Sequence, residues 1–281
     1  MPDADRLESF MMVVGELDIK SKQQCSGPAI ECSSVSVSFL DRASQVQRNI
    51  LSKLDVHVPA GSVVALLGKS GCGKSTLLRC IAGLQPIHSG KIAIGERSIE
   101  DARESLAFVF QEPALLPWRT AIENVGLPLE LQAKMSLSEV RKQAGQMLET
   151  VGFTMADREK LPSQLSGGMK MRASLARALV TEPTLLLLDE PFAALDDMLR
   201  WRLNEMLLEL CSKQSKTIVF VTHNIAEAVF LSQQIAIMHH GRIVQLIDNP
   251  LPQPRSTTLR STTEFAQFYG HASRCLGEVS S

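Results

Sequence analysis

The chain has 281 residues, of which 44% are hydrophobic and 21% charged, so it is long enough to bury a sizeable core. Its 29 basic and 30 acidic residues give a net charge of −1, which disfavours a nucleic-acid-binding protein because such proteins usually carry an excess of positive charge. The six cysteines lack the paired spacing of a zinc site, and we expect reduced thiols. No run of apolar residues reaches the roughly 18–20 that a spanning helix needs, and the acidic start is unlike a secretion signal. We therefore expect a cytosolic protein that serves a membrane only through another chain.

The first part of the chain predicts an extension followed by β structure. Residues 1–28 are polar and end in Ser26-Gly27-Pro28, which predicts a mobile N-terminal extension. The segment from Val35 to Phe39 alternates with the period of a strand, and residues 62–67 form a continuous apolar run of the buried-strand type. A helix is expected next, from Ser75 to Ala82.

The remainder predicts a helical segment and then a parallel sheet. Prolines mark the start of the segment 113–160, and an amphipathic helix is expected from Ser138, as N-cap, to Val151. Alternating strands and helices follow, which is typical of a parallel sheet with crossover helices. A tail begins after Pro250. The expected elements are a helix over 166–180, strands over 106–110, 185–189, 217–222 and 235–239, helices over 198–212 and 225–232, and a short helix over 263–269.

A glycine-rich loop between the strand 62–67 and its helix fits the pattern G-x-x-x-x-G-K-[ST]. Its glycines allow consecutive backbone N–H groups to point at a phosphate. Lys74 is expected to reach the β- and γ-phosphates, and the Ser75 hydroxyl to bind Mg²⁺. A tight glycine turn without a ligand is the alternative. The loop consists of Gly68, Lys69, Ser70, Gly71, Cys72, Gly73, Lys74, Ser75 and Thr76.

Two carboxylates follow the buried run Leu185–Leu188. Ligands of α/β sheets bind at the carboxyl ends of strands, which is where Asp189 and Glu190 are expected. Asp189 is predicted to hold Mg²⁺ and Glu190 to act as general base on the attacking water. Two solvated acids at a strand end are the alternative, which the phosphate loop disfavours.

Further motifs accompany this pair in a fixed order. Residues 165–169 are Leu-Ser-Gly-Gly-Met, Gln111 follows an apolar strand, Asp196 ends Ala194-Leu195-Asp196, and His223 follows a third strand. With these motifs the chain resembles the ATP-binding subunit of an ABC transporter over about residues 30–250. The resemblance implies an α/β P-loop NTPase fold with a RecA-like core, an antiparallel β subdomain and a helical subdomain. It implies an ATPase domain over residues 29–250, with the helical subdomain at about 113–180, and a tail over 251–281.

The resemblance also implies roles for these residues. Gln111 would contact Mg²⁺ and water, and His223 would sense the γ-phosphate. Asp196 matches the D-loop. Phe39 lies where the family places an aromatic ring that stacks on adenine, although an aromatic residue of an alternating strand is more often part of a core. The signature residues that would contact the γ-phosphate of the opposite protomer are Ser166, Gly167 and Gly168.

The finer resemblance is to the importer group for nitrate, sulfonates and taurine, which includes relatives for vitamin precursors. It rests on the segments Gln111–Thr120, Ser166–Arg172 and Pro191–Asp196. Such a chain would hydrolyse ATP with Mg²⁺ as a homodimer or a paralogue heterodimer on the cytoplasmic face of the membrane. It would act with permease subunits and, indirectly, with an extracytoplasmic solute-binding protein. Leu115–Trp118 is predicted to receive the permease, because a lone domain rarely exposes such an apolar segment; a buried anchor of the helical subdomain is the alternative.

Two other functions are compatible with a phosphate loop. A soluble ABC protein of the cluster-assembly type fits the length, whereas a small-molecule kinase would leave the signature motif unexplained. The resemblance also implies that the solute cannot be read from this chain, because it would contact the permease and the binding protein. Cys72 lies beside a helix N-terminus and Lys74, which favours its thiolate, and we expect incidental reactivity rather than regulation.

Overall fold

The computed structural model describes residues 27–40, 47–193 and 195–280. The chain divides into two compact units. The core unit consists of Ser26–Gln111 and Pro183–Ser281, and the described part of the helical unit is Glu112–Glu182. The predicted N-terminal extension over 1–28 lies outside the described residues except for its last two. Within the described residues, no helix is both long and apolar enough to cross a membrane.

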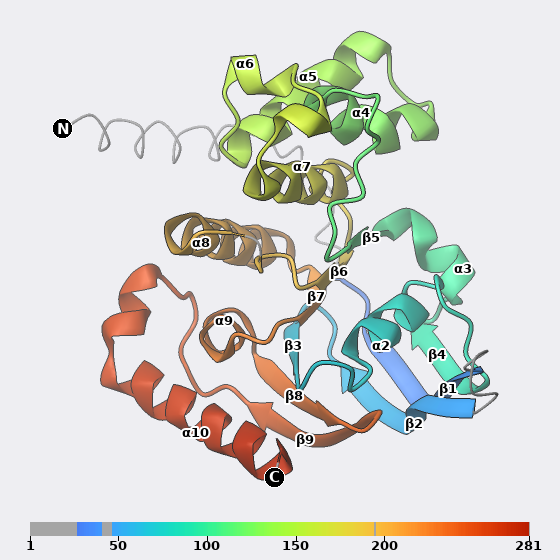
Figure 1. Ribbon diagram of the computed structural model, residues 1–281, viewed down its shortest axis with the longest axis vertical. Coiled ribbons are helices and arrows are strands. Elements are labelled where there is room, and N and C mark those ends of the chain that lie inside the picture. Colours follow the sequence, from blue (N-terminus) through green and yellow to red (C-terminus); the bar gives the residue numbers. More distant parts are fainter. Residues whose placement is uncertain (1–26, 41–46, 194, 281) are drawn as a thin grey trace. The chain divides into compact units, whose positions relative to one another are not determined.

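A six-stranded sheet forms the centre of the core unit (Figure 1). Its first five strands are parallel, as predicted, and the sixth is antiparallel to its neighbour. All five residues are buried in each of three adjacent strands, which explains their continuous apolar sequences. The strands are, in spatial order, β5 (Leu106–Val109), β6 (Leu185–Asp189), β7 (Thr217–Val221), β3 (Val63–Leu67), β8 (Gln234–His239) and β9 (Arg242–Asp248).

A second, antiparallel sheet in the core unit has the order β2-β1-β4. It comprises β1 (Ile30–Leu40), β2 (Gln47–Val58) and β4 (Ser89–Ile94). Apolar residues of this sheet share one buried cluster with helix α2 (Lys74–Ile81), which follows the glycine loop. The expected antiparallel β subdomain is therefore present, and its core supports the start of α2.

The other helices of the core unit follow the strands. They are α3 (Ile99–Ala102), α8 (Asp197–Gln214), α9 (Ile225–Leu231) and α10 (Thr263–Ser280), with 3-10 turns at Arg103–Ser105 and Thr257–Ser261. The predicted short helix over 263–269 was too short. Phe265, Phe268, Ala272 and Cys275 are buried at helical spacing, so the apolar face continues beyond residue 269. This face packs on α9, β8 and β9, and Figure 1 shows α10 running beside them.

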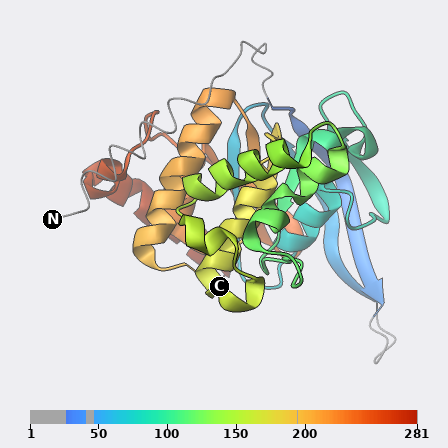
Figure 2. The same cartoon turned by 90° about the horizontal axis from the view of Figure 1, so that it is seen from above.

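The helical unit contains α4 (Ala121–Gln132), α5 (Leu137–Thr150), α6 (Met155–Arg158) and α7 (Gly167–Leu179), with a 3-10 turn at Pro162–Gln164. Helices α4, α5 and α7 pack on one another, and both views show them grouped (Figures 1 and 2). The predicted N-cap Ser138 was wrong. Ser136 caps α5 because its hydroxyl accepts from Glu139 N and the Glu139 carboxylate accepts from Ser136 N, which closes a capping box.

Candidate functional site

The glycine loop joins buried strand β3 to helix α2 and folds around the lysine side chain. Lys74 Nζ donates to the carbonyls of Gly68 at 2.8 Å and Lys69 at 2.9 Å, and the residue is only 6% exposed. Gly73 is the N-cap of α2 with φ of 107°, and Gly71 has φ of 78°, conformations that disfavour any residue with a Cβ. The loop therefore presents a cation and a helix N-terminus on one short segment.

Two contacts fix the remainder of the loop. Cys72 is buried, its Sγ lies 3.8 Å from Lys74 Nζ, and its carbonyl accepts from Gly241 N at 3.1 Å. The Gly241 carbonyl in turn accepts from Ser52 N, so the turn between β8 and β9 connects the loop to β2. Ser70 is exposed and Thr76 is half-buried.

Asp189 ends strand β6 directly opposite the start of α2. Ser75 Oγ donates to Asp189 Oδ1 at 2.7 Å, and both groups were predicted to bind the same ion. Asp189 Oδ2 is buried without a hydrogen-bond partner among the described residues, and Arg79 Nη2 lies 3.9 Å away. Burial raises the pKa of this carboxyl, against the opposing effect of the Ser75 hydrogen bond. A buried carboxylate oxygen beside a serine hydroxyl fits a hard divalent cation such as Mg²⁺.

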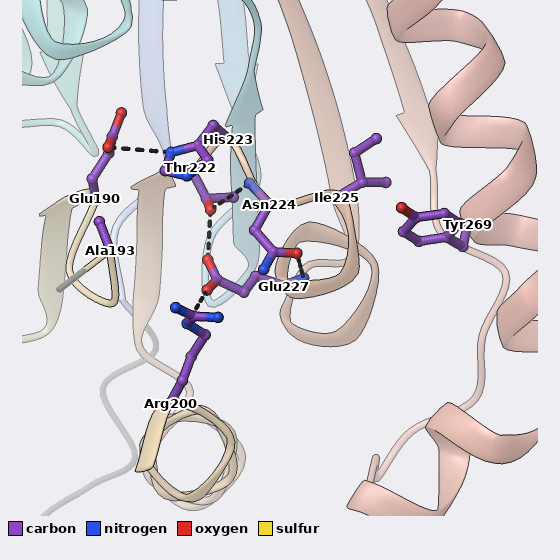
Figure 3. Close-up of a pocket in the computed structure, with 9 residues that line it drawn as sticks. All are labelled: Glu190, Ala193, Arg200, Thr222, His223, Asn224, Ile225, Glu227 and Tyr269. Atoms are coloured by element: carbon purple, nitrogen blue, oxygen red, sulfur yellow. Dashed lines mark hydrogen bonds and ion pairs between the residues drawn. The ribbon is translucent and has the colours of Figure 1, made fainter. Parts of the chain in front are cut away.

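Glu190 adopts a conformation that is rare for a residue with a side chain. Its φ is +48°, and its backbone N–H donates to Val221 O of the neighbouring strand at 3.1 Å. The side chain consequently faces the other predicted polar residues. Glu190 Oε2 lies 3.3 Å from His223 Nδ1 and 3.4 Å from Gln111 Nε2 (Figure 3 shows the histidine contact). Backbone strain of this kind is often found at functional sites.

A cavity of about 330 Å³ opens beside Glu190 and His223 (Figure 3). Several lining side chains were not singled out from the sequence. Two of them, Arg200 and Glu227, form an ion pair with an Nε–Oε1 distance of 3.3 Å. Glu227 is 4% exposed, and burial raises the pKa of its carboxyl. The other lining residues are Ala193, Thr222, Asn224, Ile225 and Tyr269.

The remaining predicted residues are not among those that line this cavity. Phe39 stands near the end of β1 and is 43% exposed, so its ring is not part of the core. Asp196 is the N-cap of α8, and its carboxylate accepts from Leu199 N at 3.0 Å. In the helical unit, Ser166 is the N-cap of α7 and accepts from Met169 N at 3.2 Å. A Cβ at Gly167 would meet open space. The signature residues thus stand at a helix N-terminus, where backbone N–H groups can bind an anion.

The segment from Leu115 to Trp118 is held from within the helical unit. The Asn124 amide group, fully buried on α4, donates to the carbonyls of Leu116, Arg119 and Thr120 and accepts from Leu116 N. Trp118 is 72% exposed, which contradicts the buried-anchor alternative for this side chain. Leu115 and Leu116 are half-buried.

Comparison with known proteins places this site in a family. A family model described as "ABC transporter" matches residues 51–193, which include the glycine loop, the signature segment and both carboxylates. The chain belongs to the ABC transporter family. An aliphatic sulfonates import ATP-binding protein of Pseudomonas syringae pv. syringae is 43% identical over 208 residues, or 74% of each chain. A protein of that description from Pseudomonas fluorescens is 42% identical over 209 residues, covering 74% of this chain and 75% of the relative.

Solved structures agree with this placement. A dimeric ATP-binding cassette in a post-hydrolysis state with ADP and Pi has a TM-score of 0.74 and 29% identity, covering 79% of this chain and all of its own. A second dimeric structure of the same cassette, described as a bacterial ABC transporter cassette, gives the same values. The expected P-loop NTPase fold is confirmed, and the chain is an ATP-hydrolysing subunit that energises an ABC importer. The importer relatives favour this function over the cluster-assembly alternative.

Proposed function

We propose that this chain hydrolyses MgATP at composite sites of a head-to-tail dimer and thereby drives import of a sulfonate-like organic anion. The observation that carries the proposal is the convergence of Gln111 and His223 on the Glu190 carboxylate, beside the Ser75–Asp189 pair. The sulfonate class is proposed from the names of the relatives, which are aliphatic sulfonate import proteins.

The catalytic roles follow from the chemistry of these side chains. Glu190 accepts a proton from the attacking water, since its carboxylate is 20% exposed and lies beside the His223 and Gln111 side chains. His223 and Gln111 orient this carboxylate and the γ-phosphate. Lys74, now bonded to two loop carbonyls, transfers its hydrogen bonds to the phosphates when the nucleotide enters.

Mg²⁺ would be held by Ser75, Gln111 and Asp189, of which Asp189 offers a buried oxygen without a hydrogen-bond partner among the described residues. The bound ion would supply charge neutralisation of the phosphates. Phe39, exposed near the end of β1, would stack on adenine. The loop residues Gly68 to Thr76 would surround the phosphates through their backbone N–H groups.

The second half of each site would come from the partner subunit. Ser166 and Gly168 stand at the N-terminus of α7, where the helix dipole and free N–H groups favour the γ-phosphate of the nucleotide on the opposite chain. One chain carries a single set of loop and signature, so two copies or a close paralogue are required. Asp196 would lie at the contact between the two subunits.

We further propose that Leu115–Trp118 binds the permease at the cytoplasmic face of the membrane. The exposed indole of Trp118 is the kind of side chain that anchors protein interfaces. Its loop is fixed in advance, because Asn124 bonds to it on one side and Arg177 Nη1 donates to Ala114 O at 2.9 Å on the other. Arg177 lies on the signature helix α7, so the docking loop and the signature share one rigid support.

Two inactive chains test the composite site. A Lys74→Ala chain and a Ser166→Arg chain are each expected to be inactive as homodimers. In a mixed dimer one site carries both lesions and the other carries neither, so some ATP hydrolysis should return. Sites built within one chain would all keep a lesion, and no activity would return.

Strict coupling of the two sites could also silence the mixture, and a dimerisation assay separates the cases. Glu190→Gln should slow hydrolysis by roughly 10²–10⁴-fold and let an ATP-bound dimer persist on gel filtration. Adding Ser166→Arg should abolish that dimer. Equal dimerisation of both variants would contradict the composite site. Rapid hydrolysis by Glu190→Gln would show that Glu190 is not the general base.

A further inference from the structure

An ion pair between the half-buried Arg200 and the buried Glu227 lines the same cavity as Glu190 and His223. Arg200 comes from the first turn of α8 and Glu227 from the first turn of α9, and their side chains are 18% and 5% exposed. The helix α8 follows the loop that begins with Glu190, and α9 follows the loop that contains His223. The pair therefore connects the two chain segments that carry these residues (Figure 3).

Arg200 holds the segment that follows Glu190. Its Nη2 donates to Leu195 O at 2.8 Å and its Nε to Phe192 O at 3.3 Å. Its Nη1 also bonds to the Asp197 carboxylate at 2.6 Å. The planar guanidinium thus contacts three residues of the segment that follows Glu190, in addition to Glu227. The ammonium group of a lysine would not reproduce this arrangement.

Glu227 holds the segment on both sides of His223. Its Oε2 accepts from Thr222 Oγ1 at 2.5 Å, and Thr222 Oγ1 accepts from Asn224 N at 3.0 Å. The Asn224 side chain then accepts from Glu227 N at 3.3 Å, which closes a ring of bonds through the two residues that flank His223 in the sequence. Burial raises the pKa of the Glu227 carboxyl, and the hydrogen bond from Thr222 and the charge of Arg200 oppose this rise. A buried carboxylate costs free energy unless it is paired or hydrogen-bonded. Its partners Thr222 and Arg200 therefore determine the position of the Glu227 side chain.

We propose that Arg200 and Glu227 are positioning residues that hold His223 against Glu190 during ATP hydrolysis. They do so through backbone and hydroxyl contacts, and no described contact joins either side chain to the P-loop. This inference rests on the proposed roles of Glu190 and His223. It predicts that loss of the pair lowers kcat and leaves ATP affinity unchanged.

The first test is a pair of conservative variants. Glu227→Gln keeps the size and an acceptor for Thr222 but loses the charge, and Arg200→Lys keeps the charge but loses the planar fork. Each should lower kcat at least tenfold, because small misplacements of catalytic groups cost up to about 10²-fold. ATP affinity, measured by equilibrium titration, should stay within about twofold, since the loop 68–76 is untouched. The matched control is Glu159→Gln, which removes an exposed ion pair with Arg141 in the helical unit and should leave kcat at the wild-type value.

A double-mutant cycle separates positioning from a general loss of stability. If Glu227 acts through His223, the combined loss of kcat in Glu227→Gln/His223→Ala should fall short of the product of the single losses by more than twofold. A combined loss within twofold of that product would overturn the proposal, as would wild-type kcat in Glu227→Gln. Should Glu227→Gln fail to fold, Thr222→Val carries the test, because it keeps the side-chain shape and removes the hydroxyl that bonds to Glu227 and to Asn224 N.

The outcome is distinguishable from failure of the proposed function. Rapid hydrolysis by Glu190→Gln would contradict the general base itself. Slow hydrolysis by Glu190→Gln together with an undisturbed Glu227→Gln would contradict the positioning role alone.

Discussion

Two glycines of the phosphate loop allow a matched test of how the loop is held. Gly71 and Gly73 both have positive φ, at 78° and 107°, so alanine at either position is strained by about 1–2 kcal/mol. Their surroundings differ. A Cβ at Gly71 would meet nothing within 4 Å, whereas a Cβ at Gly73 would lie 2.9 Å from Ile50 O and 2.9 Å from Leu51 Cδ2. Relief of that overlap should cost roughly 1–3 kcal/mol more.

We therefore expect Gly71→Ala to lower the free energy of unfolding by about 1–2 kcal/mol and Gly73→Ala by about 2–5 kcal/mol. Urea unfolding of the nucleotide-free protein measures both, with an unchanged m-value as the sign that only stability has altered. If Gly73→Ala instead displaces the loop locally, ATP affinity should fall about tenfold for each 1.4 kcal/mol. Equal unfolding free energies and equal ATP affinities for the two variants would refute the packing argument.

Three further changes have expected outcomes. Alkylation of Cys72, which is buried beside Lys74, should inactivate the ATPase slowly, and bound MgATP should protect the enzyme from it. The Cys72→Ala variant should stay active and be insensitive to the alkylating reagent. Equal inactivation of that variant would show that another cysteine is responsible. Because burial raises the pKa of Asp189, its ionised form destabilises the metal-free fold above that pKa. Asp189→Asn should thus raise the melting temperature at pH 7. This gain should be lost below about pH 4, because an ordinary aspartate is also protonated there. The variant should also lose Mg²⁺-dependent hydrolysis. Trp118→Ala should change the unfolding free energy by less than about 0.5 kcal/mol, since the ring is 72% exposed, yet abolish co-purification with the permease.

The sequence predicted those elements whose structure is determined by residues adjacent in the chain. The apolar run of β6 and the glycine loop before α2 were found because a buried parallel strand and a phosphate loop each have a signature within a few residues. Helix α4 was not predicted, because Pro128 lies inside it and proline usually ends a helix. The capping box of Thr120 and Glu123 was the available signal, since it satisfies the first turn of that helix.

Contacts between residues that are far apart in the chain could not be predicted from the sequence. The Arg200–Glu227 pair joins residues from two helices, and nothing in either helix alone indicates the partner. Among the strands that the structure describes, β9 pairs only with β8, and its half-exposed alternation is a weak sequence signal. The contacts of Asn124 could not be predicted for the same reason. This one amide on α4 bonds to Leu116 and Arg119, in a loop whose own sequence predicts only turns.

The left-handed backbone at Glu190 places stability and activity in opposition at a single position. Most side chains lose about 1 kcal/mol or more in this conformation, and glycine or asparagine loses less. A screen that selects only for heat resistance would therefore enrich glycine or asparagine at position 190 and discard the proposed general base. Thermostable variants of this chain obtained without a turnover assay should be sequenced at this codon first.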